Sequence, residues 1–481
     1  MAGRASENDV QTVISRVRER FAAGPPQAPP PVQRSAKQAL PQGAFATVDE
    51  AVDAAFEAQR QFAAMGLERR FRVVEAMRER MLEKGEYLAR AAHAETGLGR
   101  VADKILKNRL VTIKTPGPED LEPQVVTGDQ GQMLTEYAPF GVIASITPTT
   151  NPTSTIINNT IAMVAAGNAV VFNAHPGAQR VSAENVGMLN EAIVDAGGPL
   201  TLATCVAEPT IESAQNLMAH PKIRLLLVTG GPGVVAEALK TDKRAVTAGP
   251  GNPPVLVDDS ADIVHAGRSI VAGASFDNNM VCTDEKEVLA VESIADDLVK
   301  AMAANGAYVL RDHELRQLER VIFEELGPAG KPGRINRKWI GQDASKILSE
   351  IGVSVGEEIR LVVAEVPRDH SLVWTEQMMP VMPVVRIRDV EDGMQLAVAA
   401  EHGFRHTASV YSRNVDVITE MARRMNCSIF VANCSNFAGL GQMGEGFSSF
   451  SIATPTGEGL SRPRTFSRIR RLTVVGSLRI V

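Results

Sequence analysis

The chain has 481 residues, of which 44% are hydrophobic and 22% charged, a composition typical of soluble globular proteins with two or three domains. A net charge of −6 argues against a dedicated nucleic-acid binder, and we find no apolar run of membrane-spanning length. The four cysteines form no CxxC pair and no zinc spacing, so we expect reduced thiols in a bacterial-type cytoplasm and no metal site.

The first 41 residues are expected to stand apart from the globular body. Residues 1–22 carry one apolar stripe at helical spacing, which predicts a short amphipathic helix. The stripe consists of Val10, Val13, Ile14, Val17 and Phe21. The Pro-rich run at 23–41 predicts a semi-rigid linker. Such a helix either docks on another protein or packs on its own domain.

The globular body is predicted to begin near Ala44. Thr47 and Glu50 have the spacing of a capping box, and two long helices are expected at 48–64 and 68–95. From Gly141 onward strands and helices alternate, which predicts a parallel sheet. The expected strands are 141–146, 169–172, 200–206 and 223–228, and the expected helices are 156–166 and 182–196. A second α/β region is predicted to open at Val255 and to run through Val431.

Cys282 follows the polar run 277–279 and precedes Thr283, which suggests a turn rather than the centre of a buried strand. A catalytic cysteine needs such a reachable place, although an inert buried cysteine is the alternative. We interpret the other three cysteines, Cys205, Cys427 and Cys434, as structural.

Two loops could bind a substrate or cofactor. Asn151 lies where a strand breaks into a loop before a helix, so its amide could hold an oxyanion or cap the helix. The turn at 229–233, Thr-Gly-Gly-Pro-Gly, could meet a dinucleotide phosphate or be an ordinary strand-to-helix turn.

Other polar residues carry weaker signals. His402 and His406 are four residues apart but lack the glutamate of a metalloprotease motif, and we expect a loop that leads into a strand at 408–411. Six arginines between Arg462 and Arg479 indicate a solvated tail or a subunit contact, with phosphate binding as the alternative.

These segments resemble the aldehyde dehydrogenase superfamily in their order and spacing. The matching motifs are 146–152, 172–176, 228–231, Cys282 and 376–383, and the resemblance covers residues 44–470. Within the superfamily the chain resembles the CoA-acylating branch, and most of all the propionaldehyde dehydrogenases of bacterial microcompartments. The motifs specific to that branch are His175, the two asparagines before Cys282, and the tail segments 444–459 and 464–466.

The resemblance implies an α/β aldehyde dehydrogenase fold with three parts. A Rossmann-like domain for NAD and CoA would comprise 42–112 and 131–250, and a catalytic domain 251–440. A small bridging element at 113–130 and 441–481 would join subunits into a dimer or tetramer.

The resemblance also implies the roles of individual residues. Cys282 would be the nucleophile, and Asn151 with the Cys282 N–H would form the oxyanion hole. Gly230 and Gly231 would abut the cofactor diphosphate, and Glu376 would hold the nicotinamide ribose. The other expected cofactor contacts are Thr147, Pro148, Thr149, Asn173, His175, Pro176, Val234, Gly249, Pro250 and Met378. The aldehyde pocket is expected to be lined by Thr149, Thr150, Met280 and Thr283.

One departure from the superfamily pattern indicates the reaction type. Hydrolytic members carry a glutamate where this chain has Ala248. Water that attacks a thioester then lacks its general base, a loss of about 10²–10⁴-fold, whereas CoA is a better nucleophile. The implied enzyme oxidises a short aldehyde, with propanal favoured over ethanal, to acyl-CoA with NAD and CoA.

Three other functions remain as alternatives: a hydrolytic aldehyde dehydrogenase, a phosphorylating enzyme and a non-catalytic protein of the shell lumen. The resemblance also implies that residues 1–22 bind a shell protein and direct the enzyme into the lumen of a microcompartment in the bacterial cytoplasm.

Overall fold

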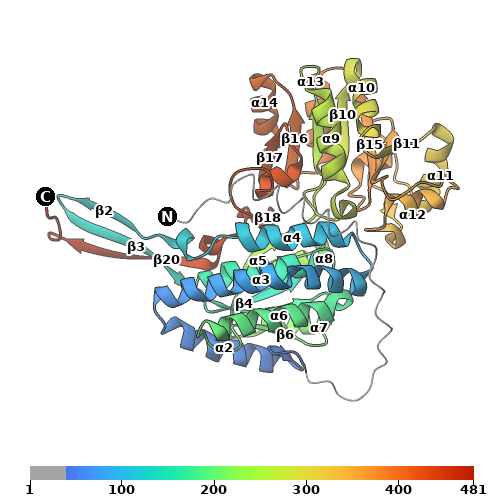
Figure 1. Ribbon diagram of the computed structural model, residues 1–481. Coiled ribbons are helices and arrows are strands. Elements are labelled where there is room, and N and C mark those ends of the chain that lie inside the picture. Colours follow the sequence, from blue (N-terminus) through green and yellow to red (C-terminus); the bar gives the residue numbers. More distant parts are fainter. Residues whose placement is uncertain (1–39) are drawn as a thin grey trace. The chain divides into compact units, whose positions relative to one another are not determined.

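The computed structural model describes residues 40–481, which hold two parallel sheets, one three-stranded antiparallel sheet and two short hairpins (Figure 1). The expected helix at 1–22 and nearly all of the linker at 23–41 lie outside the described residues. Within the described part, no helix is long and apolar enough to cross a membrane. The expected α/β architecture is confirmed.

The first sheet has six parallel strands in the order β1-β6-β5-β4-β7-β8. Its strands are β1 (Ala44–Phe45), β4 (Val142–Thr147), β5 (Ala169–Ala174), β6 (Ala203–Val206), β7 (Ile223–Thr229) and β8 (Arg244–Ala248). Every residue of β4 and β5 is buried because helices cover both faces. The chain runs outward from β4 to β6 and then returns to β7 on the other side of β4. This reversal creates a topological switch point between β4 and β7.

Two sets of helices cover this sheet. Right-handed crossovers place α5 (Pro152–Ala165) and α6 (Gln179–Asp195) on one face, and α7 (Ile211–Ala219) and α8 (Pro232–Leu239) on the other. Helices α3 (Leu67–Thr96) and α4 (Val101–Lys114) form a further layer outside α5 and α6, and α2 (Val48–Ala63) packs on the sheet beside α7. The expected capping box at Thr47 and Glu50 is confirmed.

The second sheet has seven parallel strands in the order β11-β14-β15-β10-β9-β16-β17. Its strands are β9 (Pro254–Val257), β10 (Glu287–Val291), β11 (Ala307–Val309), β14 (Leu361–Glu365), β15 (Val381–Ile387), β16 (Thr407–Tyr411) and β17 (Ile429–Ala432). One core cluster joins the sheet to α9 (Ile263–Ala274) and α10 (Glu292–Ala303). The other joins it to α11 (Asp312–Ile322), α12 (Ala344–Ser349), α13 (Val390–Ala400) and α14 (Val415–Met425). Two separate doubly covered sheets therefore build the body of the molecule.

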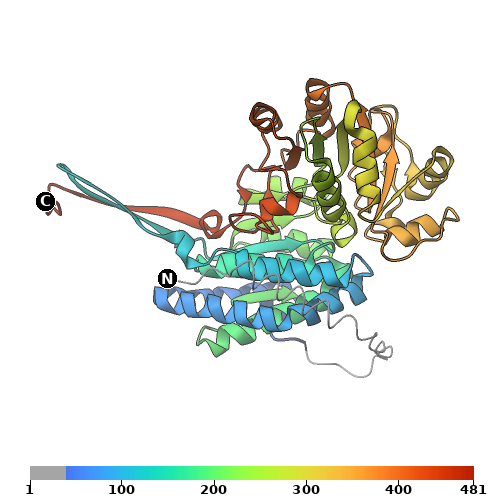
Figure 2. The same ribbon diagram turned by 45° about the horizontal axis from the view of Figure 1, so that its top comes forward.

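The third sheet is an arm that projects from the two parallel-sheet layers and carries the C-terminus (Figures 1 and 2). It consists of β2 (Gln124–Gly128), β3 (Gly131–Pro139) and β20 (Ser467–Val475), all antiparallel. The structure differs here from the expected boundary at residue 131, since β3 belongs to the arm. Its partner β20 lies more than 300 residues later, so local sequence could not reveal the pairing.

The segment at 441–466 also departs from the expected bridging element. Phe450, Ile452 and Ala453 belong to the same hydrophobic core as the first sheet, and β18 (Ile452–Ala453) packs beside β8. These residues therefore return to the body of the molecule before β20 enters the arm. Two short hairpins, β12 (Phe323–Glu325) with β13 (Arg334–Ile335) and β18 with β19 (Gly459–Leu460), complete the strands.

Candidate active site

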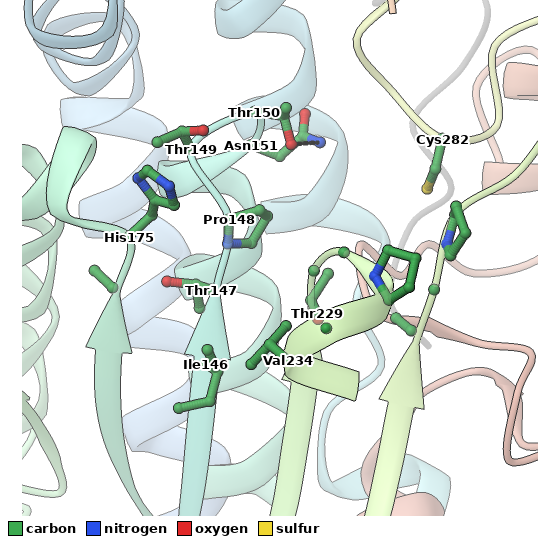
Figure 3. A pocket seen from close by; sticks show the side chains of 18 of the residues that line it. Ile146, Thr147, Pro148, Thr149, Thr150, Asn151, His175, Thr229, Val234 and Cys282 are labelled. Carbon is green, nitrogen blue, oxygen red and sulfur yellow. Dashed lines mark hydrogen bonds between the residues drawn. The ribbon is translucent and has the colours of Figure 1, made fainter. Parts of the chain in front are cut away.

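A cavity of about 800 Å³ opens at the carboxyl ends of β4, β5, β7 and β8. This is the switch point of the first sheet, where open α/β sheets commonly bind ligands. Figure 3 shows the loop after β4 and the start of α8 on one side of the cavity, and Cys282 on the other. The strand ends and the turn that carries Cys282 thus face a common space.

The structure brings every predicted catalytic and cofactor-binding residue to this cavity. The expected aldehyde-pocket residues Thr149, Thr150 and Met280 also line it. Thr283 does not: it is fully buried and outside the lining, so its expected place in the pocket is wrong. The chain turns inward directly after Cys282, and the run 283–287 lies entirely in the interior.

Cys282 is held by a turn of unusual backbone conformation. Asp277, Asn278 and Asn279 have φ values of 44°, 59° and 63°, the left-handed region that asparagine and aspartate tolerate best among residues other than glycine. Hydrogen bonds hold the turn from several elements, including two from the Asn278 amide group to the Gly341 carbonyl and the Asp343 carboxylate. Within residues 40–481 no backbone carbonyl accepts a hydrogen bond from the Cys282 N–H. It remains available to a ligand.

The electrostatic surroundings of Cys282 favour the protonated thiol. Burial and, to a smaller extent, the Glu376 carboxylate together raise the pKa of this thiol to about 12, whereas Lys286 acts in the opposite direction. A nucleophilic thiolate therefore requires a proton acceptor or an added positive charge in the cavity. The side chain is half-buried but lines the cavity, so a small molecule can reach the sulfur.

Asn151 is the N-cap residue of α5, but its side chain makes no capping bond to that helix. Its Oδ1 accepts a hydrogen bond of 2.5 Å from the Lys107 ammonium group, and its Nδ2 donates to the Thr150 hydroxyl at 3.3 Å. An amide nitrogen has two hydrogens. One of them therefore remains for a ligand in the cavity.

The turn at 229–233 suits the diphosphate of a dinucleotide. The helix α8 begins after Gly231, and no side chain caps its free backbone N–H groups. A Cβ at Gly231 would meet nothing within 4 Å, so the space above this backbone belongs to the cavity. Thr147 contributes a buried hydroxyl without a partner in the described structure. The Glu376 carboxylate also lines the cavity and accepts a hydrogen bond of 3.3 Å from the Gly251 N–H. Together these groups fit a dinucleotide.

Ala248 ends β8 and lines the cavity with a methyl group where the hydrolytic relatives are expected to have a carboxylate. The titratable side chains of the lining are His175, Glu237, Cys282, Arg337 and Glu376. Burial raises the pKa of Glu376 and lowers that of His175. A general base at position 248 is absent from the described structure.

Sequence reasoning missed two groups of lining residues. The start of α7 contributes Thr210, Ile211, Ala214, Gln215 and Met218, and the returning segment contributes Ser449, Phe450 and Ile452. The first group gave no signal because it has the pattern of an ordinary amphipathic helix. The second lies inside the tail motif at 444–459, whose branch specificity was a usable sign of a functional role.

The remaining cysteines and the histidine pair lie outside this lining. Burial raises the pKa of the Cys205 thiol to about 12, as expected for a structural residue. The Nε2 of His402 lies 2.8 Å from the Trp374 carbonyl oxygen, within hydrogen-bond distance. His406 is buried directly before β16. Among residues 40–481, no group of three or more His, Cys, Asp or Glu side chains is arranged to hold a metal ion.

Comparisons with known proteins agree with this geometry. The model of the aldehyde dehydrogenase family matches residues 28–316 and 360–451. The chain therefore belongs to the aldehyde dehydrogenase family, and the expected resemblance is confirmed.

The most similar relatives come from the acylating members. The acetylating acetaldehyde dehydrogenase EutE of Salmonella typhimurium is 48% identical over 91% of this chain and 94% of its own. The CoA-propanoylating propanal dehydrogenase of the same organism is 42% identical over 98% of this chain and 99% of its own.

Two solved structures are similar over nearly their whole length, each with a TM-score of 0.88. One is a propionaldehyde dehydrogenase of Rhodopseudomonas palustris with bound CoA and an acylated cysteine, 45% identical over 91% of this chain and 99% of its own. The other is a propionaldehyde dehydrogenase from the fucose-utilisation microcompartment of Clostridium phytofermentans, 43% identical over 92% of this chain and all of its own.

Proposed function

We propose that this protein is a CoA-acylating aldehyde dehydrogenase that converts a short aliphatic aldehyde, NAD and CoA into acyl-CoA and NADH. One observation carries the proposal: Cys282 and Asn151 line the same cavity as Ala248, which stands at the position of the hydrolytic base. The acylated cysteine and bound CoA of the Rhodopseudomonas palustris structure support it.

In the first half-reaction the Cys282 thiol loses its proton to solvent, its sulfur forms a bond to the aldehyde carbon, and the carbonyl electron pair moves to oxygen. The Asn151 Nδ2 and the Cys282 N–H donate hydrogen bonds to this oxyanion. When bound, the oxidised nicotinamide supplies the hydride acceptor and a positive charge that favours the thiolate. Collapse of the tetrahedral centre re-forms the carbonyl, expels the hydride and leaves a thioester on Cys282.

In the second half-reaction the thiol of CoA attacks the thioester carbon, and its proton passes to the departing Cys282 sulfur. The same two donors hold the second oxyanion, the carbon–sulfur bond to Cys282 breaks, and acyl-CoA leaves. Water competes poorly because the methyl group of Ala248 accepts no proton. The chemistry of position 248 thus selects a thiol as the acyl acceptor.

The cavity offers apolar surface for a short aliphatic chain. Thr150 and Met280 line it together with the apolar side chains of Leu440, Phe450 and Ile452. We favour propanal, with ethanal as the alternative, and the named relatives include enzymes of both kinds. One methylene in an apolar pocket changes specificity by about 10–200-fold, so comparing kcat/KM for the two aldehydes decides between them.

Trapping the thioester tests the proposal directly. The protein is mixed with propanal and NAD without CoA, and its intact mass is measured before and after CoA is added. We expect one propionyl group that maps to Cys282 and disappears as propionyl-CoA forms. A cysteine that never becomes acylated, in a protein that still reduces NAD, would contradict the mechanism.

We also propose that residues 1–22 direct the enzyme into a microcompartment by binding a shell protein. The alignment with the Salmonella propanal dehydrogenase covers 98% of this chain and therefore reaches into residues 1–39. The microcompartment origin of the Clostridium phytofermentans enzyme supports the setting. Deletion of residues 1–22 should leave turnover intact and abolish co-purification with shells, and full packaging of the truncated enzyme would refute the idea.

The arm supports a proposal of homo-oligomers. Its strands β2 and β20 expose five large apolar side chains, namely Val125, Val126, Ile469, Leu472 and Val475. Such a surface is typical of subunit contacts, and we propose that a second copy of this chain covers it in a dimer or tetramer. Light scattering should show a smaller assembly for Leu472→Glu than for the unaltered protein.

A further inference from the structure

A buried lysine joins the two sides of the cavity. Lys107 lies on α4 with 2% of its side chain exposed, and its ammonium group donates to Asn151 and to the carboxylate of Asp277. Asn151 precedes α5, whereas Asp277 begins the left-handed turn that leads to Cys282. A single side chain therefore contacts both the amide and the turn that together form the oxyanion site.

We infer that Lys107 is a positioning residue that fixes the orientation of the Asn151 amide and its distance from Cys282. This inference rests on the oxyanion role proposed above for Asn151. A lysine ammonium group has three donors and no acceptor, so it can bind the oxygen of an amide but not its NH₂ group. The oxygen of Asn151 is consequently turned toward Lys107, and the nitrogen toward Thr150 and the cavity.

The orientation matters because the two ends of an amide group act oppositely on an oxyanion. The NH₂ end stabilises the developing negative charge, whereas the carbonyl end repels it. A side-chain amide can rotate between these two arrangements at little cost unless a partner selects one. Lys107 is that partner, and its charge makes the selecting hydrogen bond stronger than a neutral one.

The surrounding charges keep Lys107 in place. Asp277 also accepts from the Lys104 ammonium group at 3.0 Å and from the Arg100 N–H at 2.7 Å. The Asp103 carboxylate accepts from the Asp277 N–H and from Arg360, which ties this cluster to the second sheet. The first residue of the turn before Cys282 is thus anchored from α4.

Lys104 provides a matched control for Lys107. The two lysines are one turn apart on the same face of α4, both are buried, and both pair with the same oxygen of Asp277. No hydrogen bond joins Lys104 to Asn151 in the described structure. A purely structural role, compensation of the buried aspartate, predicts equal effects for the two lysines, whereas positioning of the amide predicts a larger effect for Lys107.

The test compares the single variants Lys107→Met, Lys104→Met and Asn151→Ala with the double variants Lys107→Met/Asn151→Ala and Lys104→Met/Asn151→Ala in the full-length enzyme. We measure kcat and KM for propanal with NAD and CoA, the rate of NADH formation in the first turnover, and the thermal midpoint. Asn151→Ala should lower kcat by about 10²–10³-fold. Lys107→Met should lower kcat and the first-turnover rate at least about tenfold more than Lys104→Met, at a similar thermal midpoint, because amide orientation acts on the oxyanion.

The double variant separates positioning from structural damage. If Lys107 acts through Asn151, its replacement in the Asn151→Ala background should cost no more than Lys104→Met costs there. Equal losses of kcat in Lys107→Met and Lys104→Met would overturn the inference. So would a loss of kcat in Lys107→Met/Asn151→Ala that equals the product of the losses in its two single variants. A small effect of Asn151→Ala on kcat would instead contradict the oxyanion role proposed for Asn151 itself.

A less disruptive variant covers the case in which Lys107→Met does not fold. Lys107→Gln keeps an N–H donor for the Asn151 oxygen without the charge, so we expect a kcat between those of Asn151→Ala and the unaltered enzyme. A folded glutamine variant as slow as Asn151→Ala would contradict the role assigned to the hydrogen bond.

Discussion

The two sides of the cavity are built on different principles. One side, which we call the sheet wall, consists of the loops that follow β4, β5, β7 and β8. Each of these loops takes its place from the strand directly before it. The other side, the cysteine wall, is the turn at 277–282, whose left-handed residues are held by side chains from α4, by Lys286 and by the segment near Gly341. Local sequence determines the first wall, and distant contacts determine the second.

Helix α4 shows why such long-range support is difficult to predict from the sequence. Its buried residues include Asp103, Lys104, Lys107 and Asn108, whereas Leu106 and Ile113 are exposed. This arrangement is the reverse of an ordinary surface helix, which buries its apolar side. A polar inner face is explained by the charged turn against which it packs. The difference between the walls predicts different consequences when each is altered.

The largest effect is expected on the cysteine wall. Cys282→Ala removes the atom that forms the thioester, so CoA-dependent NADH formation should fall by about 10⁴-fold or more. Cys434→Ala is the matched control, since Cys434 is also partly exposed but lies outside the cavity lining, and it should retain near-normal turnover. Comparable rates for the two variants would exclude Cys282 as the nucleophile.

The next effect is a gain of function on the sheet wall. Ala248→Glu places a carboxylate at the end of β8, where it can take a proton from water, and CoA-independent NADH formation from propanal should rise at least about tenfold. Ala248→Gln has nearly the same shape without the base and should show no such rise. If the glutamine variant gains as much as the glutamate variant, the identity of residue 248 does not select the acyl acceptor.

A smaller effect on the sheet wall should appear in cofactor binding. Gly231→Ala adds a methyl group to the space expected for the diphosphate, and its φ of −67° is compatible with alanine. We expect KM for NAD to rise several-fold with kcat nearly unchanged, the pattern of lost uniform binding. Gly66→Ala, also at an N-cap with φ of −68° but far from the cavity, should leave KM unchanged. An unchanged KM for NAD in the Gly231 variant would show that the diphosphate does not bind at this turn.

The smallest effect concerns stability behind the cysteine wall. Burial raises the pKa of Glu285 to about 7 from the 4.5 of an unperturbed glutamate. The folded protein therefore binds a proton more tightly than the unfolded chain between these pH values, and stability falls as pH rises through this window, by at most about 3 kcal/mol. Glu285→Gln should match the unaltered protein at pH 5 and melt a few degrees higher at pH 8.

The exposed residue Glu79 supplies the control for that measurement. Its replacement by glutamine should leave the thermal midpoint unchanged at both pH values, because it lies in water on α3. A Glu285→Gln variant that melts lower than the unaltered protein at pH 8 would show that the charged carboxylate is stabilised in the fold, contrary to this account.

The sequence predicted the α/β fold and the lining of the sheet wall well, for a physical reason. Parallel strands present their carboxyl ends at one edge, so motifs that follow consecutive strands, such as Asn151, Asn173 and Gly230, necessarily meet there. All the predicted residues except Thr283 line the cavity.

The supports of the cysteine wall could not be predicted in the same way. Lys107 lies 170 residues before Asp277, and a lysine in an amphipathic helix is ordinarily solvated. The arm gave the same difficulty, since β3 pairs locally with β2 but acquires its second partner, β20, only from the end of the chain. In both cases the decisive contact is long-range, and no local pattern specifies it.

The most direct test of the central claim is NADH formation from propanal and NAD by the purified protein, with and without CoA. The account predicts strict dependence on CoA with propionyl-CoA as the product, because Ala248 leaves water without a base while Cys282 and Asn151 remain able to form the thioester. Equal turnover without CoA, with propionate as the product, would contradict it and would show that another group of the cavity activates water.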